Sequence, residues 1–245
     1  MTLPVFLVDA LPAGGSAVLD GPEGRHAATV RRLHAGEELV LSDGSGDQVR
    51  CVVDEVLDKD ALRLTVVERW TVPDPTPRVV LAQALVKGDR GELAVELATE
   101  AGVDGVVPWR AARCVTKWEE GPRGAKALAR WRSTAREAAK QARRAKVPSV
   151  DEPVSTSGLA RLVSSSALTL VLHESAKTAL NTVSLPADGD VLLVVGPEGG
   201  ITDQELVTLT DAGAHVVRLG PTVLRASTAA AVALGALGVL SRRWE

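Results

Sequence analysis

Val191-Leu-Leu-Val-Val-Gly-Pro-Glu-Gly-Gly-Ile-Thr-Asp-Gln-Glu205 is the stretch of sequence that decides the fold. Its five opening apolar residues lack polar alternation, which predicts a strand covered on both faces of a sheet. Thr202 and Glu205 have the spacing of a capping box, so a helix is expected to begin directly after the glycine-rich turn. Gly196, Gly199 and Gly200 allow a ligand to approach the backbone at the carboxyl end of the strand, where α/β sheets bind ligands. A plain strand-to-helix turn would need the same glycines.

The residues around this stretch predict an α/β domain. A second loop, Leu219 to Ala229, again follows an apolar run and opens an apolar helix, so two loops on neighbouring strands could form one pocket. Strands are expected at 79–85, 103–108, 168–172, 191–195 and 215–219, and helices at 90–101, 125–145, 203–212 and 227–240. Strands that alternate with helices in this way predict a mostly parallel sheet with helices on both faces.

The chain before this α/β region predicts a small β-rich domain. Val72-Pro73-Asp74-Pro75-Thr76-Pro77 holds three prolines in six residues, which is typical of a stiff linker. Short apolar runs separated by turn residues precede it, at 5–8, 38–41, 49–53 and 62–67, with one helix expected at 26–33. We therefore expect a β-rich domain over residues 1–72, a linker over 73–77 and the α/β domain over 78–245.

Composition excludes several classes of protein. Hydrophobic residues make up 45% and charged residues 24% of the chain, which excludes a wholly disordered protein. With one Phe, no Tyr and five Trp, the chain is not expected to use aromatic stacking as its main mode of RNA binding. Two cysteines favour a reducing compartment, and no spacing of His, Cys, Asp or Glu predicts a metal site. The apolar start follows no Lys or Arg, and the uncharged stretch 226–240 is too short to cross a bilayer, so we expect a cytoplasmic protein without membrane contact.

The formal net charge of −3 conceals a basic middle segment. The net charge is −5 over residues 1–72, +6 over 73–150 and −4 over 151–245. Residues 113–146 alone carry 11 basic and 3 acidic side chains. Because salt screens charges beyond about 8 Å, this local surplus can attract a polyanion although the whole chain is acidic. The alternative interpretation is a solvated helix face whose charges serve solubility.

The two glycine-containing loops together resemble those of a known family. GPEGGITDQE (196–205) followed by LGPTVLRASTAA (219–230) resembles the SPOUT methyltransferases, and most closely the ribosomal RNA small subunit methyltransferase E family. KGDRGELAVELATEAGVDGVVPW (87–109) and REAAKQARRAKVP (136–148) resemble further segments of that family, and residues 1–72 are similar to its PUA-like barrel. One departure from the pattern matters: where the family commonly reads Leu-Arg-Thr-Glu-Thr-Ala, this chain has Leu224-Arg225-Ala226-Ser227-Thr228-Ala229, so any role of that Glu is absent or moved.

The resemblance implies an enzyme that transfers a methyl group from S-adenosylmethionine to N3 of a uridine in the decoding region of 16S rRNA, in the small ribosomal subunit. It also implies a PUA-like β-barrel followed by a SPOUT α/β domain with a trefoil knot, which is an exception to ordinary topology. The cofactor-binding residues that it implies lie in three loops: Leu172, His173, Gly196, Pro197, Glu198, Gly199, Gly200, Ile201, Leu219, Gly220, Val223, Leu224, Arg225 and Ala226. The expected RNA-binding residues are Arg31, Arg32, Arg136, Lys140, Gln141, Arg143, Arg144 and Lys146.

Arg225 and Glu198 are the candidate catalytic residues. The N3 proton of uracil is weakly acidic, so methylation at N3 requires loss of this proton and stabilisation of the charge on the carbonyl oxygens. The forked guanidinium of Arg225 suits that charge, although an arginine at a helix start can equally pair with solvent or with a carboxylate. Glu198 could assist proton removal, or could bond backbone within its own turn. His26, His34 and His215 are expected to be structural.

Two other functions remain open from the sequence. A non-catalytic RNA-binding ribosome-assembly factor would use the β-rich domain and the basic segment, and a related knotted enzyme would methylate another base or a ribose 2′-hydroxyl.

Small residues of the last helix leave room for another element to pack closely: Ala229, Ala230, Ala231, Ala233, Gly235, Ala236 and Gly238. They fit either a buried helix within the chain or a homodimer. The resemblance favours the homodimer, formed through this helix and the helix after Lys87.

Overall fold

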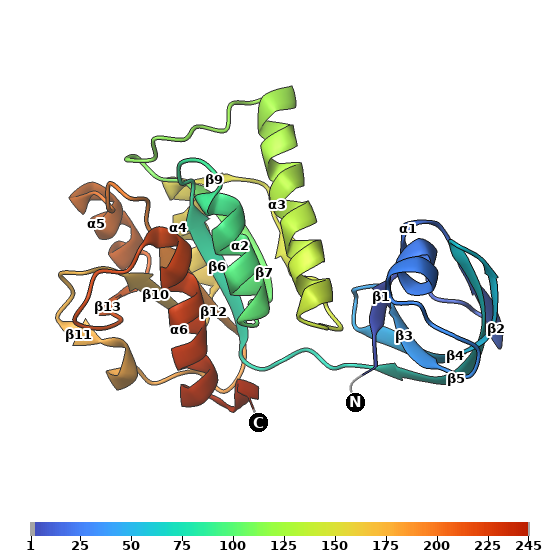
Figure 1. The fold of residues 1–245 in the computed structure, drawn as a ribbon. Coiled ribbons are helices and arrows are strands. Elements are labelled where there is room, and N and C mark those ends of the chain that lie inside the picture. Colours follow the sequence, from blue (N-terminus) through green and yellow to red (C-terminus); the bar gives the residue numbers. More distant parts are fainter. Residues whose placement is uncertain (1–2, 245) are drawn as a thin grey trace. The chain divides into compact units, whose positions relative to one another are not determined.

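The computed structural model describes residues 3–244, which fold into two compact units (Figure 1). The first unit comprises the chain up to Asp74 together with Ala139–Val147. The second comprises Pro75–Ala138 and the chain from Pro148 onward. The division therefore falls inside the proline-rich segment, and residues 139–147 belong with the first unit although the sequence places them in the α/β domain.

The first unit is built on a five-stranded sheet with the strand order β1-β3-β4-β5-β2. The strands are β1 (Val5–Leu7), β2 (Ser16–Leu19), β3 (Glu38–Ser42), β4 (Asp47–Asp58) and β5 (Ala61–Thr71). All pairs except β1 with β3 are antiparallel, and three register shifts between β4 and β5 bend these two long strands. The core of the unit includes the fully buried side chains of Phe6, Leu39, Cys51, Leu62 and Leu64.

One helical segment lies between β2 and β3. α1 (Gly21–Arg25) runs directly into a π-helical turn, η1 (His26–Val30). The helix predicted at 26–33 therefore starts earlier, with Pro22 in its first turn, where a missing N–H costs nothing. It also ends earlier, because Arg32 has a φ of 55°, in the left-handed region.

An ion pair and hydrogen bonds hold residues 139–147 in the first unit. Lys140 forms an ion pair with Glu23 of α1. The hydroxyl of Ser42 donates to the carbonyl of Ala145 at 3.3 Å, and the N–H of Val147 donates to the carbonyl of Gly44 at 2.9 Å. The second half of the basic segment therefore lies beside the β-rich core.

The second unit contains an eight-stranded sheet in the order β11-β13-β10-β12-β6-β7-β8, with β9 paired to β7. The strands are β6 (Arg78–Ala84), β7 (Gly105–Arg110), β8 (Ser149–Val150), β9 (Val154–Ser155), β10 (Leu168–Leu172), β11 (Thr178–Ala179), β12 (Asp190–Val195) and β13 (His215–Arg218). The strand pairs described in this sheet are parallel, so the predicted α/β fold is confirmed.

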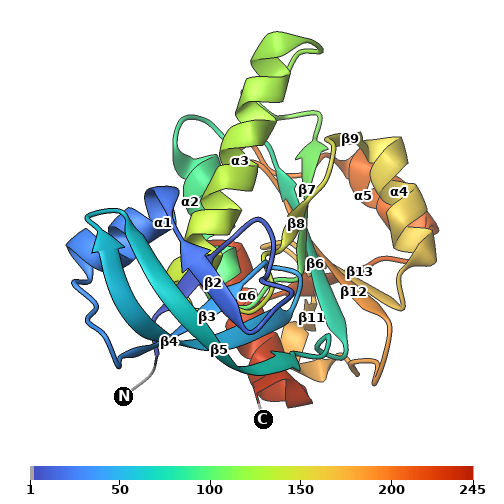
Figure 2. The ribbon, with the colours of Figure 1, turned by 90° about the vertical axis from the view of Figure 1, so that its right-hand side faces the viewer.

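Helices cover both faces of this sheet (Figure 2). α2 (Arg90–Glu100), α3 (Pro122–Gln141) and α6 (Ala226–Leu240) lie on one face, and α4 (Thr156–Ser165) and α5 (Asp203–Asp211) lie on the other. Short 3-10 turns, η2 (Leu180–Thr182) and η3 (Arg242–Trp244), follow β11 and α6. Within residues 3–244, no helix combines the length and the apolar composition that a membrane crossing needs.

The central strand β12 shows why the sheet is covered on both sides. Leu193 and Val195 pack in the core that includes α2 and α6, whereas Leu192 and Val194 pack in the core that includes α4 and α5. Each face thus buries alternate side chains of one uninterrupted apolar run, as the sequence predicts.

Two helices, α3 and α4, differ from the prediction. α3 ends at Gln141 instead of reaching 145, because Arg143 adopts a φ of 54° and stops the helix. The sequence does not predict α4, whose serine-rich stretch hides its apolar spacing. The hydroxyl of Ser155 accepts a hydrogen bond from the N–H of Gly158 at 3.2 Å and caps this helix.

Candidate active site

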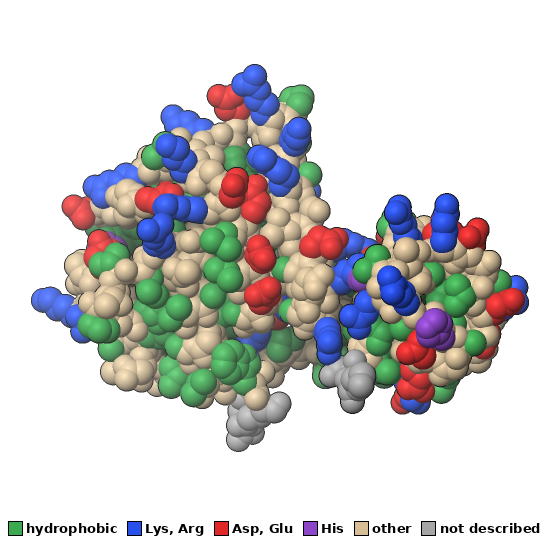
Figure 3. All heavy atoms as spheres, in the orientation of Figure 1, with side chains coloured by type: hydrophobic (Ala, Val, Ile, Leu, Met, Phe, Trp, Pro, Cys, Tyr) green, Lys and Arg blue, Asp and Glu red, His purple; other side chains and the backbone are tan. Residues whose placement is uncertain are grey.

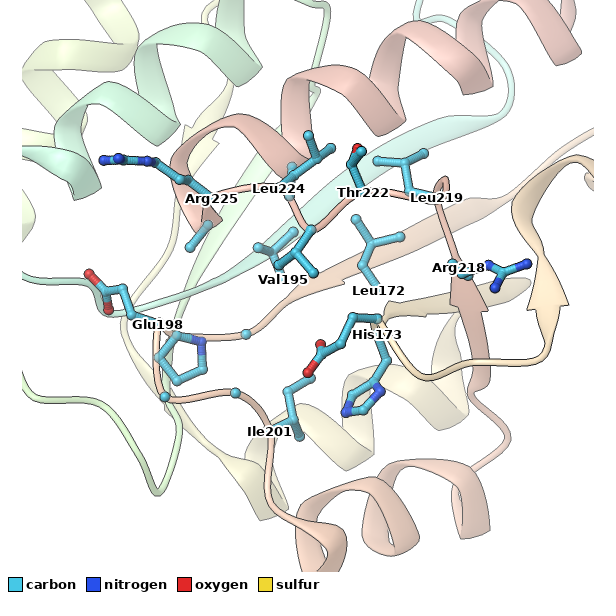
Figure 4. A pocket seen from close by; sticks show the side chains of 18 of the residues that line it. Leu172, His173, Val195, Glu198, Ile201, Arg218, Leu219, Thr222, Leu224 and Arg225 are labelled. Carbon is cyan, nitrogen blue, oxygen red and sulfur yellow. The ribbon is translucent and has the colours of Figure 1, made fainter.

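Three loops of the second unit meet at the carboxyl edge of its sheet. They follow β10, β12 and β13, which are neighbours in the sheet, so parallel pairing brings their carboxyl ends together. The loops line a cavity of about 670 Å³ (Figure 4), within the usual size range of small-molecule sites. All fourteen residues expected to bind the cofactor, from Leu172 to Ala226, line this cavity.

The cavity also has lining residues that the sequence analysis did not select. They are Arg90, Arg113, Glu174, Val195, Asp203, Arg218, Pro221, Thr222 and Ala229. Most of them flank the predicted loops and could have been found by extending those loops. Arg90 and Arg113 lie about a hundred residues away along the chain, and only the fold brings them to the cavity.

The glycine-rich turn after β12 requires its glycines for its own geometry. Gly200 has a φ of 75°, and its N–H donates to the carbonyl of Pro197 at 2.9 Å. A Cβ atom on Gly196 would lie 2.6 Å from Cγ1 of Ile201, and one on Gly199 would lie 3.1 Å from Cβ of Arg113. The turn is therefore tightly packed against its neighbours while its backbone faces the cavity.

The predicted capping box at the start of α5 is confirmed. The hydroxyl of Thr202 accepts from the N–H of Glu205 at 3.3 Å, and the carboxylate of Glu205 accepts from the N–H of Thr202 at 3.1 Å. Burial raises the pKa of Glu205, but hydrogen bonds from Ala112, Thr202 and Thr156 outweigh it and leave the pKa below its ordinary value. Glu205 is therefore an ionised carboxylate beneath the cavity's glycine-rich turn.

Arg225 holds the start of α6 with its backbone and leaves its side chain available. Its carbonyl accepts from the N–H groups of Thr228 and Ala229, both at 3.0 Å. Its guanidinium is exposed and makes no hydrogen bond or ion pair with the described residues. Figure 4 shows the side chains of Arg225 and Glu198 reaching toward the same side of the cavity, away from its apolar centre around Leu172.

Glu198 is held from another loop and not within its own turn. Its Oε1 atom accepts from the backbone N–H of Lys87, which follows β6, at 3.2 Å. One carboxylate oxygen is thereby fixed, and the other has no partner among residues 3–244. This arrangement leaves a hydrogen-bond acceptor at the same side of the cavity as the guanidinium of Arg225.

The charges around the cavity are of both signs. Four arginines and three carboxylates line it: Arg90, Arg113, Arg218 and Arg225, with Glu174, Glu198 and Asp203. Such a lining suits a ligand that itself carries both positive and negative charge.

Both the backbone and the imidazole of His173 make hydrogen bonds at the cavity. The N–H of His173 donates to the carbonyl of Val217 at 3.0 Å, which joins the ends of β10 and β13. Its Nδ1 atom lies 2.9 Å from the hydroxyl of Ser175 and 3.3 Å from the N–H of the same residue. The imidazole is thus engaged within its own loop.

Neither cysteine is poised as a nucleophile. Burial raises the pKa of Cys51 to about 11 and raises the pKa of Cys114 above its ordinary value, so both are thiols at neutral pH. In the part of the chain that the structure describes, no cluster of three or more His, Cys, Asp or Glu side chains is placed to hold a metal ion.

Seven of the eight expected RNA-binding residues lie in the first unit, and Arg136 lies in the second. Four of the eight are exposed: Arg31, Arg32, Gln141 and Arg143. Lys140 is only 13% exposed in its ion pair with Glu23, and Lys146 pairs with Asp74. These two lysines hold the unit together, so they are less available to RNA than the sequence suggests.

Figure 3 shows hydrophobic side chains gathered where α2 and α6 lie; this face is called the apolar surface of α2 and α6. The exposed large apolar side chains of α2, α6 and η3 are Leu93, Val232, Val239, Leu240 and Trp244. The small residues of α6 pack mostly within the chain: Ala229, Ala230 and Ala233 are buried in the core, and a Cβ atom on Gly238 would collide with the ring of Trp244. A second copy of the chain would therefore meet the larger apolar residues, not the small ones.

The comparisons with known proteins agree with the fold. The model of an RNA methyltransferase domain matches residues 73–238, and the model of an RNA methyltransferase PUA domain matches residues 19–67. Ribosomal RNA small subunit methyltransferase E of Mycobacterium bovis is 54% identical over 250 residues, covering 100% of this chain and 95% of that protein. The Bacillus subtilis protein of the same name is 33% identical, covering 89% of this chain and 88% of its own.

A solved structure extends the likeness to a ligand-bound relative. The crystal structure of a ribosomal RNA small subunit methyltransferase E from Neisseria gonorrhoeae, bound to S-adenosyl methionine, is 26% identical and superimposes with a TM-score of 0.83 over 98% of each chain. The chain therefore belongs to the RNA methyltransferase family, and within it to the ribosomal RNA small subunit methyltransferase E family, with a PUA-like first unit.

Proposed function

We propose that the protein transfers a methyl group from S-adenosylmethionine to N3 of a uridine in the decoding region of 16S rRNA. The observation that carries this proposal is the cavity at the carboxyl edge of the sheet, lined by Arg225, whose guanidinium has no partner among residues 3–244. The family of the chain and the S-adenosyl methionine bound to the Neisseria gonorrhoeae relative support the cofactor. The choice of uridine N3 rests on the resemblance and on the chemistry of Arg225 and Glu198.

The residues of the cavity fit S-adenosylmethionine, which carries an apolar ring face, a sulfonium, an ammonium and a carboxylate. Leu172, Val195 and Leu224 form an apolar wall. The arginines of the cavity can pair with the carboxylate of S-adenosylmethionine, and its carboxylates with the sulfonium and the ammonium. A Cβ atom on Gly220 would meet nothing within 4 Å, so backbone there is open to a ligand. When bound, the cofactor would supply an electrophilic methyl group.

Glu198 and Arg225 would then handle the uracil base. The free oxygen of Glu198 accepts the N3 proton, while the Lys87 N–H holds the other oxygen in place. Arg225 stabilises the negative charge that spreads to the carbonyl oxygens as this proton leaves, because its planar fork matches adjacent acceptors. Ser227, which stands where the family commonly has Glu, is 4% exposed at the start of α6 and takes no part in this scheme.

The first unit would hold the rRNA by its phosphates. Arg31, Arg32, Gln141 and Arg143 are exposed, and the Lys140–Glu23 ion pair brings the two stretches that carry them together. Lys and Arg contacts of this kind position a backbone and seldom read a base. Base selection would then take place at the cavity.

A second copy of the chain would cover the apolar surface of α2 and α6. Exposed large apolar side chains that gather on one face are typical of a protein interface. We therefore propose a homodimer through this surface, a trefoil knot in the second unit as in the SPOUT family, and action on the small ribosomal subunit in the cytoplasm.

Mass spectrometry of 16S rRNA nucleosides from cells with and without the protein tests the function. Loss of N3-methyluridine in the cells without it is the expected result. Loss of another methylated base or of a 2′-O-methylated nucleoside would identify the related knotted enzyme instead. Unchanged nucleosides, together with no heat of S-adenosylmethionine binding in calorimetry, would leave the RNA-binding assembly factor as the function.

A further inference from the structure

The carboxylate of Glu205 joins three segments of the second unit. It lies in the first turn of α5 and is only 5% exposed. Its Oε2 atom accepts from the N–H and the hydroxyl of Thr202, at 3.1 and 2.8 Å. Its Oε1 atom accepts from the N–H of Ala112 at 2.8 Å and from the hydroxyl of Thr156 at 2.9 Å. A capping box needs only the contacts with Thr202, so the other two have a different role.

The hydrogen bond from the N–H of Ala112 to Glu205 fixes the chain directly before Arg113, the residue that supports the glycine-rich turn. Arg113 follows directly, and its guanidinium donates to the carbonyl of Gly199 at 3.0 Å. The turn also lies against the backbone of this residue, because a Cβ atom on Gly199 would lie 3.3 Å from the carbonyl oxygen of Arg113. The loop at 111–114 is therefore a wall behind the turn that lines the cavity.

The contact with Thr156 ties the same carboxylate to the rigid core. The hydroxyl of Thr156 also accepts from Nε1 of Trp109, at 3.2 Å, and Trp109 is fully buried near the end of β7. A buried carboxylate is tolerated only when its hydrogen bonds are satisfied, and here four donors satisfy it. Glu205 itself does not line the cavity.

We infer that Glu205 is a positioning residue, which holds the loop at 111–114 and, through Arg113, sets the glycine-rich turn in its ligand-binding shape before the cofactor arrives. The inference rests on the proposed function only in taking the cavity to bind S-adenosylmethionine. A turn that is shaped in advance loses less conformational entropy on binding, so Glu205 acts on cofactor affinity. Once the cofactor is bound, the turn and Glu198 within it have the same shape with or without Glu205, so the chemical step is unchanged.

Glu205→Gln is the most informative variant because it keeps the shape of the side chain. In either orientation of the new amide, its NH2 group faces a backbone N–H, of Ala112 or of Thr202. One buried hydrogen bond is lost, and S-adenosylmethionine should bind about tenfold more weakly in calorimetry. At saturating cofactor, kcat and the KM for RNA should stay within about twofold of the wild-type values. Asp211→Asn, an exposed carboxylate at the far end of the same helix, is the matched control.

A double-mutant cycle with Arg113→Ala separates positioning from simple stabilisation of the helix. Arg113→Ala alone should also weaken cofactor binding, by about fivefold, and the double variant should bind no more weakly than Glu205→Gln alone. The indole N–H resonance of Trp109 should shift in Glu205→Gln and not in Asp211→Asn. If Glu205→Gln fails to fold, unchanged cofactor affinity in Arg113→Ala would by itself overturn the inference.

Wild-type cofactor affinity in Glu205→Gln, with a lowered unfolding temperature, would reduce Glu205 to a helix cap. Additive losses in the double variant would show that Glu205 does not act through Arg113. A wild-type protein that binds no S-adenosylmethionine would overturn the proposed function, and the inference with it.

Discussion

Replacing Arg225 with Ala should separate cofactor binding from methyl transfer. The contacts that this residue makes to α6 come from its carbonyl, which accepts from Thr228 and Ala229, and alanine keeps them. Its φ of −67° and ψ of 148° are also open to alanine. Because the guanidinium has no partner among the described residues, its removal should not unfold the start of the helix.

The expected size of the effect follows from what the guanidinium would do. Loss of one preorganised donor to a developing oxyanion costs about 2.7 to 4 kcal/mol, or roughly 100- to 1,000-fold in kcat. Affinity for S-adenosylmethionine should change by less than about tenfold, since the loop backbone stays in place. Arg225→Lys should recover little of the rate, because an ammonium lacks the planar fork.

The assay measures cofactor affinity by calorimetry and methyl transfer to small ribosomal subunits under single-turnover conditions. Arg161→Ala, an exposed arginine of α4 that does not line the cavity, is the matched control. Equal losses of cofactor affinity and rate would place Arg225 in the cofactor site alone. Full activity in Arg225→Ala would remove it from the mechanism.

Four further predictions concern the glycine-rich turn, the hydrogen bonds of Glu205, the expected RNA-binding arginines and the homodimer. Gly196→Ala should displace Ile201, whose Cγ1 would lie 2.6 Å from the new Cβ, and cost about 1 to 3 kcal/mol of stability, measured by urea unfolding. The pKa of Glu205 is lowered in the fold, so its ionised form stabilises the folded protein above the ordinary carboxyl pKa. The difference in free energy of unfolding between wild type and Glu205→Gln should therefore be largest near pH 7 and vanish as the pH falls through that lowered pKa. A difference that grows in acid contradicts this. Arg32→Gly combined with Arg143→Gly removes two charges at positions of positive φ, where glycine is favoured, so the fold should persist. The slope of log affinity for single-stranded rRNA against log salt should become less steep by about 1.4. An unchanged slope would show that the phosphate contacts lie elsewhere. Val232→Glu on α6 should give monomers in sedimentation velocity at micromolar concentration, whereas Val207→Glu, equally exposed on α5, should stay dimeric; a wild-type monomer with full activity would dismiss the dimer.

The sequence alone was enough for the features that depend on neighbours along the chain. The apolar run of β12, the glycine-rich turn and the Thr202–Glu205 capping box appear in the structure as predicted. So does the loop that opens α6. Each is set by backbone geometry and by hydrogen bonds that span only a few residues, so its signature is legible in a short stretch.

The ends of some helices, and the whole of α4, could not be predicted from the sequence. Arg143 and Arg32 stop helices by taking positive φ, which arginine rarely does, so no residue preference announces it. α4 was hidden because its serines serve as caps and surface residues, and they dilute the apolar spacing. Local propensity is weak enough for tertiary packing to override it at such places.

Only the tertiary structure determined which distant residues meet. It brought Arg90 and Arg113 to the cavity, the N–H of Lys87 to Glu198, and residues 139–147 to the β-rich unit. It also showed that Gly238 accommodates the ring of Trp244 within the chain. Spacing in the sequence reports which face of an element is buried, but the partner of that face is chosen by packing over the whole fold. For that reason the residues indicated two loops of the cavity and the family resemblance added the third, at Leu172 and His173, whereas the residues that support these loops could not be found from the sequence.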